Sequence, residues 1–563
     1  MNNPELIGSL NPVKKRLRVG LLVDSFIQPR WIHKIVQDIQ TSSIATIVLV
    51  IKNAAQLPQK RFRIQNYWQN RSHLLFAAYN RFDDSKTHVE PDAFEEADIE
   101  TLVRECPVIN VEPLMTKYVD RFKEEDLKQI NEYQLDVAIR LGFRILKGDV
   151  LSIARHGVWS YHHGDSNVNR GGPAGFWEVM EGEPVTGAML QILTEDLDNG
   201  QVLSRSWSPT SDRFSVKLNR NHYYWKSSAF VMRKLRELYE QNELSFEKNS
   251  IYQPYSARLY RAPTNSEMLR LLSRVSGRYF VAKTENLFFF NQWSLAYRFR
   301  SGPNDANDAF YKFKYLIPPK DRFWADPFTL SVDDKYFIFL EEFIYEAGKG
   351  HISVIEIDRN GNYQAPITIL EKDYHLSYPF IFEYAGDYYM IPETASHNTV
   401  ELYRCTTFPS EWELDTVLFE GVNATDATLL ERDGLWWMFV NLGEMKYPSD
   451  WDELYIFYAD TPKGEWKPHK RNPVKKDVRN SRPAGSLFEW KGQLCRPAQN
   501  SSVRYGYGIS INKILRLSPD EFVEEEVSKI LPEWNQAVLG THTLSRSRDL
   551  TVIDCLMRRS RFS

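Results

Sequence analysis

Residues 135–203 read LDVAIRLGFRILKGDVLSIARHGVWSYHHGDSNVNRGGPAGFWEVMEGEPVTGAMLQILTEDLDNGQVL. The stretch opens with a short apolar run, residues 136–141, that ends at a glycine-containing turn, as is typical of a buried strand. Residues 17–23 and 45–51 are similar apolar runs. Helical periodicity lies between these runs, in PRWIHKIVQDIQTS (29–42) and FKEEDLKQINEYQ (122–134). Strands that alternate with helices predict a parallel sheet of the α/β class.

The turn after the first predicted strand excludes one common use of such a sheet. A dinucleotide-binding fold needs a glycine-rich turn there, because the backbone must approach the pyrophosphate closely. The chain has DSFIQ (24–28) instead. Nicotinamide and flavin binding are therefore not supported, and a different ligand is expected at the carboxyl edge of the sheet.

Five motifs follow one another between residues 142 and 200. They are GFRIL (142–146), His162, RGGP (170–173) with Trp177, GE (182–183) with TG (186–187), and LDNG (197–200). Over about residues 17–205, this order resembles the N10-formyltetrahydrofolate-dependent formyltransferases, which include the sugar N-formyltransferases. The resemblance implies an α/β formyltransferase-type (Rossmann-like) domain, N10-formyltetrahydrofolate as co-substrate, and no metal.

The resemblance also implies roles for individual residues. An amine attacks the formyl carbonyl, so a base must take a proton while an oxyanion is stabilised. His162 is the implied base, and Asp198 is the carboxylate that orients it. Ser160 occupies the oxyanion position, where the family has an asparagine. The implied pterin pocket is formed by Phe143, Arg144, Ile145 and Leu146.

Each motif also has a purely structural explanation. Asp198 suits the LDNG turn for backbone reasons alone. The residues RGG (170–172) can form a loop before a helix that Pro173 opens. The oxyanion donor also has alternatives, namely His163, Asn167 and Asn169, and the sequence leaves them open.

From Tyr279 on, the sequence contains an internal repeat. Each unit joins two aromatic strands through a tight polar turn such as DDK, AGD or RDG. The residue before the first strand of each unit recurs about every 50 residues, at Asp326, Tyr378, Asp426, Arg482 and His542. Five such units predict an all-β five-bladed propeller, with residues 279–290 completing the ring beside the C-terminal segment.

In a propeller, the starts of the blades converge on a central axis although they are far apart in sequence. We therefore predict one substrate-binding pocket, formed by Asp326, Glu393, Asp426, Arg482 and His542. Glu341 and Glu342 are placed at nearby strand ends. The 13% share of aromatic residues fits both a large β domain and flat surfaces for sugar binding.

The motifs FWADPF (323–328), SYPFIFEYAGDYYMIPET (377–394) and DATLLERDGLWWMF (426–439) resemble two kinds of propeller. One is that of glycoside hydrolase family 43, and the closer one is the N-terminal propeller of glucosamine inositolphosphorylceramide transferases. The hydrolases use three carboxylates. Asp326 fits the base position, but Tyr378 stands where the second blade would offer an aspartate. Three uses stay open: hydrolysis with Glu393 and Asp426 completing the set, carbohydrate binding or another sugar chemistry, and a scaffold.

Composition limits the partners of the protein. A formal net charge of −4 over 563 residues gives no field that would attract nucleic acid. The N-terminal residues lack the apolar core of a signal peptide, and no apolar run approaches the length of a membrane span. The four cysteines are far apart and form no CxxC pair, which argues against structural zinc. These features predict a cytoplasmic protein without a transmembrane segment or nucleic-acid partner, and they leave an oligomer open.

The chain is expected to comprise an N-terminal tail (1–16), a formyltransferase-like domain (17–245), a helical linker (246–277) and the propeller (278–563). The predicted activity is transfer of a formyl group to the amine of an amino sugar, free, nucleotide-linked or within a glycan, in polysaccharide or glycolipid biosynthesis. One alternative is a glycosidase or glycosyl-transfer enzyme of the propeller beside a degenerate formyltransferase domain. The other is a non-catalytic glycan-binding protein.

Overall fold

The computed structural model describes residues 14–55, 71–165, 170–196, 200–210, 214–247, 259–300, 309–443 and 452–562. The chain divides into two compact units, which we call the first unit, Leu10–Tyr279, and the second unit, Phe280–Ser563. Helix α8 (Asn265–Phe288) crosses this division. The second half of the predicted linker is therefore helical and belongs to the first unit.

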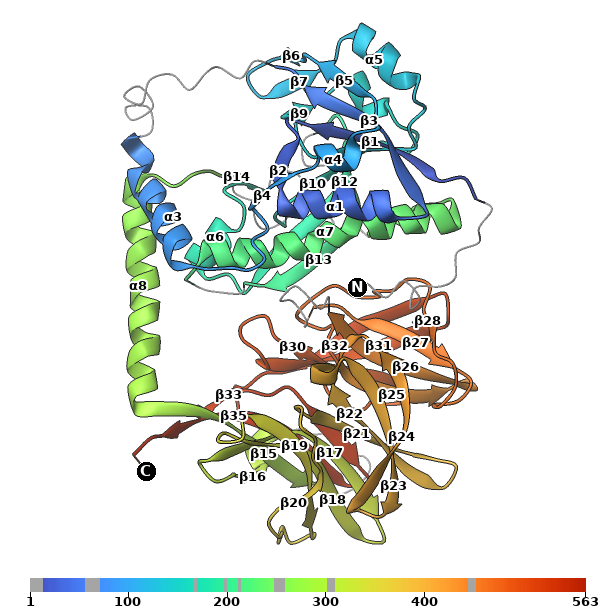
Figure 1. The fold of residues 1–563 in the computed structure, drawn as a ribbon. Coiled ribbons are helices and arrows are strands. Elements are labelled where there is room, and N and C mark those ends of the chain that lie inside the picture. Colours follow the sequence, from blue (N-terminus) through green and yellow to red (C-terminus); the bar gives the residue numbers. More distant parts are fainter. Residues whose placement is uncertain are drawn as a thin grey trace. The chain divides into compact units, whose positions relative to one another are not determined.

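The first unit contains a seven-stranded sheet in the order β13-β12-β10-β8-β1-β3-β5 (Figure 1). Its strands are β1 (Leu17–Val23), β3 (Ala45–Asn53), β5 (Val108–Val111), β8 (Val137–Arg140), β10 (Val158–His162), β12 (Val185–Ile192) and β13 (Gln201–Pro209). The strands from β10 to β5 are parallel, and β12 and β13 add an antiparallel hairpin. The three strands predicted from the apolar runs are confirmed as β1, β3 and β8.

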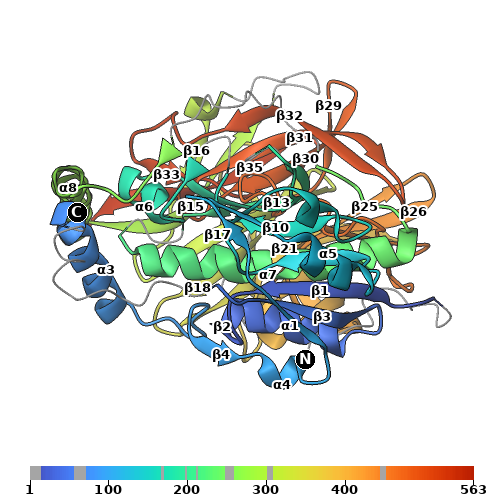
Figure 2. The ribbon, with the colours of Figure 1, turned by 90° about the horizontal axis from the view of Figure 1, so that it is seen from above.

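Two helices of the first unit, α1 (Arg30–Thr41) and α7 (Val216–Gln241), lie side by side (Figure 2). Helix α1 buries Ile32, Ile35 and Ile39, whose spacing gives one apolar face. The sequence predicted only the second half of α7, from residue 228. Its first half buries Tyr223 and Trp225 among polar residues, so it lacks the aliphatic periodicity that marks a helix.

The remaining elements of the first unit are short. Its other helices are α3 (Leu74–Lys86), α4 (Glu100–Val103), α5 (Glu124–Asn131) and α6 (Phe176–Glu181). The predicted helix 122–134 is confirmed as α5. The small sheets pair β2 (Ile27–Pro29) with β4 (Glu96–Asp98), β7 (Val119–Arg121) with β6 (Leu114–Met115) and β9 (Ile145–Leu146), and β11 (Arg170–Gly171) with β14 (Leu259–Tyr260).

The second unit contains five antiparallel sheets within the described residues. The first four are β17 (Arg322–Val332) to β20 (Ile367–Leu370), β21 (Ser377–Tyr384) to β24 (Glu411–Glu420), β25 (Asn423–Arg432) to β28 (Lys467–Pro468), and β29 (Phe488–Trp490) to β32 (Phe522–Ile530). The two middle strands of these sheets are β18 (Lys335–Ile344) and β19 (Lys349–Ile357), β22 (Asp387–Thr394) and β23 (Thr399–Thr407), β26 (Leu435–Gly443) and β27 (Tyr455–Ala459), and β30 (Gln493–Asn500) and β31 (Gly508–Leu517). The fifth combines β15 (Phe289–Phe299), β16 (Lys314–Leu316), β33 (Val538–Gly540), β34 (Leu544–Ser547) and β35 (Leu550–Ser560).

The first four sheets begin with the same kind of hairpin. In each, two residues connect the first strand to the second, and both have positive φ: 47° and 63° at Asp333 and Asp334, and 54° and 78° at Asp433 and Gly434. Positive φ at both positions defines the turn whose twist matches that of paired strands, and it favours Asp and Gly. The predicted turns DDK, AGD and RDG are thus confirmed.

Neighbouring sheets of the second unit pack on each other in an order that returns to its start. One buried cluster joins the first three sheets through residues such as Phe339, Met390 and Trp436. A second joins the third sheet to the fourth, where Phe439 contacts Phe522. Two further clusters join the fourth sheet to the fifth and the fifth to the first. Each predicted repeat therefore forms one sheet, and the abundant aromatic side chains fill the space between sheets.

The fifth sheet contains both the first and the last strand of the second unit. Strand β15 pairs antiparallel with β35, from Phe289↔Ser560 to Phe299↔Leu550 (Figure 1). Pairing with the C-terminal segment was expected for residues 279–290. The structure corrects these bounds, because residues up to Phe288 continue helix α8 and the paired strand begins at Phe289.

None of the helices among the described residues combines the length and the apolar character that crossing a membrane requires.

Candidate functional site

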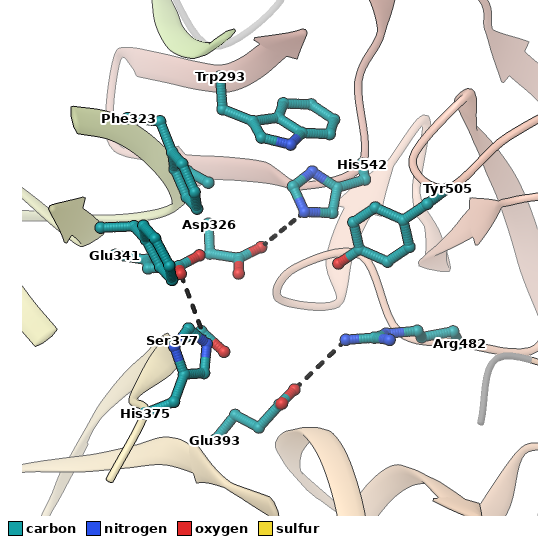
Figure 3. Close-up of a pocket in the computed structure, with 12 residues that line it drawn as sticks. Trp293, Phe323, Asp326, Glu341, His375, Ser377, Glu393, Arg482, Tyr505 and His542 are labelled. Carbon is teal, nitrogen blue, oxygen red and sulfur yellow. Dashed lines mark hydrogen bonds and ion pairs between the residues drawn. The ribbon is translucent and has the colours of Figure 1, made fainter. Parts of the chain in front are cut away.

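A pocket of about 310 Å³ lies in the second unit (Figure 3). Part of its lining is aromatic, and Phe323 and Phe343 stack there with ring centroids 4.9 Å apart. The indole of Trp293 lies 4.2 Å from the imidazole of His542, between ring centroids. The charged part of the lining is formed by Asp326, Glu341, Glu393, Arg482 and His542. Aromatic faces beside a few convergent polar groups suit a ligand with one apolar face and several hydroxyl or amine groups.

A repeated backbone irregularity turns side chains of the first strands inward. The pairing of β17, β21 and β25 with the next strand is interrupted by a bulge in each sheet. Each bulge contains a residue in the left-handed region, namely Asp326 (φ 48°), Tyr378 (φ 44°) and Asp426 (φ 57°). The sequence placed these residues before the first strands. They lie within the strands instead, because a bulge re-aims one side chain without ending the pairing.

Tyr378 is buried and connects three sheets. Its hydroxyl accepts a hydrogen bond from the backbone N–H of Gly485 at 2.7 Å and lies 2.8 Å from the hydroxyl of Thr428. The position that would hold the second carboxylate of a hydrolase thus holds a structural phenol. The three carboxylates of such a hydrolase are therefore not formed in the usual way here.

His542 lies between two aspartates in the pocket. Its Nδ1 is 2.5 Å from a carboxylate oxygen of Asp554, and its Nε2 is 3.4 Å from Asp326. Asp554 also accepts the backbone N–H of His542 at 2.7 Å and that of Thr543 at 3.1 Å. Burial opposes charge on the ring, but Asp554 and Asp326 hold the pKa of His542 above its ordinary value.

The same three residues are the group among the described residues whose atoms could surround a metal ion, with ligand atoms within 4.8 Å of one another. Both nitrogens of His542, however, already face carboxylates. We therefore describe the group as an ion-paired Asp–His–Asp set. Burial is the main reason that the pKa of Asp326 rises to about 6.

Arg482 lies between two other carboxyl groups. It donates from Nε to Asp426 at 2.5 Å and from Nη2 to the same carboxylate at 3.1 Å. Nη2 also donates to Glu393 at 3.3 Å. Asp426 accepts a further hydrogen bond from Gln499 at 2.8 Å. A bidentate guanidinium–carboxylate pair has a fixed geometry, so Arg482 is held firmly at the wall of the pocket.

Glu341 and Glu342 are neighbours on β18 with opposite environments. Glu342 accepts hydrogen bonds from Trp324 at 3.1 Å, Arg322 at 3.0 Å and Ser353 at 2.8 Å. Burial would raise its pKa, but these donors and His351 lower the pKa of Glu342 to about 2. Glu341 points into the pocket, where His375 lies 3.5 Å from its carboxylate. Burial, followed by the neighbouring carboxyl groups, raises the pKa of Glu341 well above its usual range.

The structure brings together four of the five predicted pocket residues in the lining: Asp326, Glu393, Arg482 and His542. Asp426 is held behind Arg482. The sequence did not predict a place in or beside the pocket for Trp293, Phe323, Phe343, His375, Tyr505 and Asp554. Asp554 could have been found, because it is a charged residue inside the apolar strand LTVIDCLM (550–557).

The first unit has a second group of polar side chains, at the carboxyl edge of its parallel strands. Arg140 ends β8, and Ser160 and His162 lie at the end of β10. Arg140 donates to the Ser160 hydroxyl at 2.9 Å and to the carbonyls of Phe143 and Arg144 at 2.9 and 3.0 Å. The Ser160 hydroxyl itself donates to the carbonyl of Tyr161 at 3.3 Å. Ser160 thus has its hydrogen engaged, and Arg140, which the sequence analysis missed, is the cationic donor beside it.

The predicted pterin-binding segment is strongly tied to the rest of the unit. The side chains of Phe143 and Leu146 belong to its buried core. The backbone N–H of Phe143 donates to Asp24 at 2.8 Å, and that of Arg144 donates to Asp120 at 2.9 Å. The Arg144 side chain pairs with Asp120 as well. Ile145 is half-buried, and contacts between this segment and a cofactor stay a prediction.

His163 and Asp165, which follow the predicted base in the sequence, have defined places. His163 stacks on Tyr224, with ring centroids 3.6 Å apart, and burial lowers its pKa well below the ordinary value. Asp165 accepts a hydrogen bond from Trp207 at 2.9 Å. Asp198, Asn167 and Asn169 lie outside the described residues.

Comparison with known proteins gives two similarities. Residues 318–552 match the family model described as "Glucosamine inositolphosphorylceramide transferase 1, N-terminal". The chain is 35% identical over 223 residues to Glucosamine inositolphosphorylceramide transferase 1 of Oryza sativa subsp. japonica, covering 38% of this chain and 30% of that protein. It is 32% identical over 83 residues to Methionyl-tRNA formyltransferase of Prochlorococcus marinus, covering 14% of this chain and 24% of that protein. The chain thus spans less than a third of these relatives, and both similarities concern parts of them.

Among solved structures, the catalytic domain of a GH62 alpha-L-arabinofuranosidase from Coprinopsis cinerea has 12% identity and a TM-score of 0.32, covering 48% of this chain and 98% of that chain. Glycinamide ribonucleotide transformylase 1 from Symbiobacterium toebii has 12% identity and a TM-score of 0.28, covering 41% of this chain and 92% of that chain.

Glu341 and Glu342 offer a matched test of the electrostatics of the pocket. Unfolded glutamates ionise near pH 4, whereas folded Glu341 keeps its proton to higher pH, so its contribution to stability falls as the pH rises above about 4. We expect Glu341→Gln to raise the melting temperature more at about pH 8 than at about pH 4. Glu342→Gln removes a well-paired carboxylate and should cost about 1–3 kcal/mol at pH 8. That cost should shrink as the pH falls from about 4 towards 2.

Thermal melts of both variants across this pH range measure the two effects. A stabilisation by Glu341→Gln that does not change with pH would contradict the electrostatic cause.

Proposed function

We propose that this protein is a formyltransferase that moves a formyl group from N10-formyltetrahydrofolate to the amine of an amino sugar. We further propose that the five sheets of the second unit form a five-bladed propeller that binds the sugar part of the acceptor. The observation that carries the first proposal is the group Arg140, Ser160 and His162 at the carboxyl edge of the parallel strands. Ligands of open α/β sheets bind at this edge.

The three side chains suit the requirements of acyl transfer to an amine. A neutral amine attacks the formyl carbon, so negative charge develops on the formyl oxygen and the nitrogen must lose a proton. An imidazole at the end of β10 can take that proton. The guanidinium of Arg140 stays charged at neutral pH and can donate to the oxygen. We therefore assign the base to His162 and the oxyanion donor to Arg140, with Ser160 holding the guanidinium in place.

The co-substrate would supply only the activated formyl group. We place its reacting end, as part of the proposal, beside the donor and base just described. Its heterocycle would have to use groups other than the N–H of Phe143 and Arg144, because Asp24 and Asp120 accept hydrogen bonds from both. The five ordered motifs and the 83-residue similarity to a formyltransferase support the proposal further. Asp198 as partner of His162 and a cytoplasmic location are parts of the same proposal.

A second candidate function is sugar cleavage or glycosyl transfer in the pocket of the second unit. The buried carboxyl groups of Asp326, Glu341 and Glu393 favour it, because the raised pKa of a carboxyl group suits an acid that protonates a leaving oxygen. The match of residues 318–552 to the family described as "Glucosamine inositolphosphorylceramide transferase 1, N-terminal" agrees with this candidate.

His162→Ala tests the base. We expect formyl transfer from N10-formyltetrahydrofolate to amino sugars to fall by about 10²–10⁴-fold, because proton removal loses its acceptor. Mass spectrometry of the formylated sugar measures the rate. His88→Ala, at an exposed histidine, is the matched control and should retain full activity. An active His162→Ala enzyme would remove His162 from the mechanism.

Arg140→Met tests the oxyanion donor. We expect kcat to fall by about 10²–10³-fold, the cost of losing one such donor. Ser160→Ala should cost less, because the hydroxyl positions the guanidinium without donating to the substrate. Arg104→Met, at an exposed arginine, controls for the loss of charge, and melting curves check folding. A larger loss for Ser160→Ala than for Arg140→Met would reverse the assignment.

Asp326→Asn separates the two candidate functions. If chemistry occurs in the first unit, formyl transfer persists in this variant at close to the original kcat. If the pocket cleaves or transfers sugars, that activity is lost, because an amide cannot replace a carboxyl group in proton transfer. Parallel assays of formyl transfer and of sugar release on one preparation give both readouts.

A further inference from the structure

The charges around the pocket of the second unit do not balance. Two basic side chains each lie between two carboxyl groups: His542 between Asp326 and Asp554, and Arg482 between Asp426 and Glu393. Glu341 is a fifth carboxyl group, 5% exposed and directed into the pocket. Within the described part of the chain, Glu341 has no lysine or arginine partner.

The histidine beside Glu341 does not supply the missing charge. Nδ1 of His375 accepts a hydrogen bond from the backbone N–H of Gly350 at 2.8 Å. This leaves the ring proton on Nε2, which faces Glu341 at 3.5 Å. Burial lowers the pKa of His375, so the ring is neutral near pH 7. Glu341 therefore faces a neutral donor and not a cation.

An unbalanced buried carboxyl group is costly. Burial and the facing carboxyl groups Asp326, Glu393, Asp554 and Asp426 raise the pKa of Glu341 well above its usual range. In these surroundings the protonated form of Glu341 is favoured over the carboxylate. A ligand that brings a positive charge would let this group ionise and form a buried ion pair.

We propose that the pocket binds the protonated amine of an amino sugar, with Glu341 as its counter-ion and aromatic rings against the sugar. An ammonium group is attracted to the faces of aromatic rings as well as to carboxylates, and Trp293, Phe323 and Phe343 line the same pocket. The apolar face of a pyranose packs on such rings, while Asp326 and Arg482 can bind hydroxyl groups. The choice of an amino sugar as ligand rests on the proposed function.

The proposal has a consequence for the order of events. Formylation converts an ammonium-forming amine into a neutral amide, so a glycan whose amines have all been formylated no longer carries the charge that Glu341 would bind. The pocket would retain glycans that still carry amines and release those that have been formylated. The amine held in the pocket is then a recognition element, distinct from the amine that accepts the formyl group.

Isothermal titration calorimetry with the full chain tests the proposal. Glucosamine should bind at least about tenfold more tightly than glucose, N-acetylglucosamine or N-formylglucosamine, which is a difference of about 1.4 kcal/mol. Glu341→Gln should abolish this preference, whereas Glu346→Gln, at an exposed position on the same segment, should retain it. Binding should also release a proton from Glu341, so the heat should depend on the ionisation enthalpy of the buffer, and this dependence should disappear in Glu341→Gln.

Three results would overturn the proposal. They are equal binding of glucosamine and glucose, tighter binding of N-acetylglucosamine, and an unchanged preference in Glu341→Gln. Titration with magnesium or manganese ions is a further arm, and a metal ion that excludes glucosamine would assign the excess carboxyl groups to a cation site.

Formyl transfer measured on the same samples distinguishes this inference from the proposed function. Selective binding of glucosamine without formyl transfer would sink the proposed function and leave the pocket assignment standing. Formyl transfer without selective binding would overturn the pocket assignment and leave the proposed function standing.

Discussion

The pairing of β15 with β35 is the constraint on which the second unit depends. It hydrogen-bonds the first strand of the unit to the last along their whole length. The pairing places Trp293 on β15 and Asp554 on β35 next to the bulge of β17, where the backbone N–H of Asp326 points at Asp554 at 3.4 Å. Without this closure, the pocket would lack one wall and His542 would lose its buried counter-ion.

The charged groups of the pocket are difficult to explain by stability alone. Removing a carboxylate from water costs several kcal/mol, and an ion pair repays this only when geometry and hydrogen bonds are excellent. Glu342 and Asp426 meet that condition, since donors surround both. Glu341 does not. A buried group that stays unbalanced in a tightly packed β structure is more readily understood as part of a binding site.

Several motif residues of the first unit have structural roles. Gly187 allows β12 to pass Asp165, because a Cβ atom there would lie 2.8 Å from the side chain of Asp165. Gly171 approaches the carbonyl of Tyr260 so closely that a Cβ atom would lie 2.3 Å away. Such glycines maintain the shape of the unit. Arg140, Ser160 and His162 instead lie at the carboxyl edge of the sheet. A resemblance built on motifs therefore reports the fold more directly than the activity.

The sequence alone determined the class of both units and some of their elements. Apolar runs predicted β1, β3 and β8, polar tight turns predicted the repeated hairpins, and a period of about 50 residues predicted one sheet per repeat. These features are local, so a short window of sequence contains them. The sequence also identified Asp326, Glu393, Arg482 and His542 as pocket residues, because each lies at or near an equivalent position of its repeat.

Only the tertiary structure decided which charges meet. Asp554, Trp293 and His375 lie outside the repeated positions and reach the pocket through strand closure and loop packing. Glu341 and Glu342 are adjacent and of the same residue type. Because side chains alternate between the two faces of β18, Glu342 faces a full set of hydrogen-bond donors and Glu341 faces the pocket. Arg140 became a candidate donor only when β8 and β10 were paired. Electrostatics depends on distance in space and on burial, and neither can be read from positions along the chain.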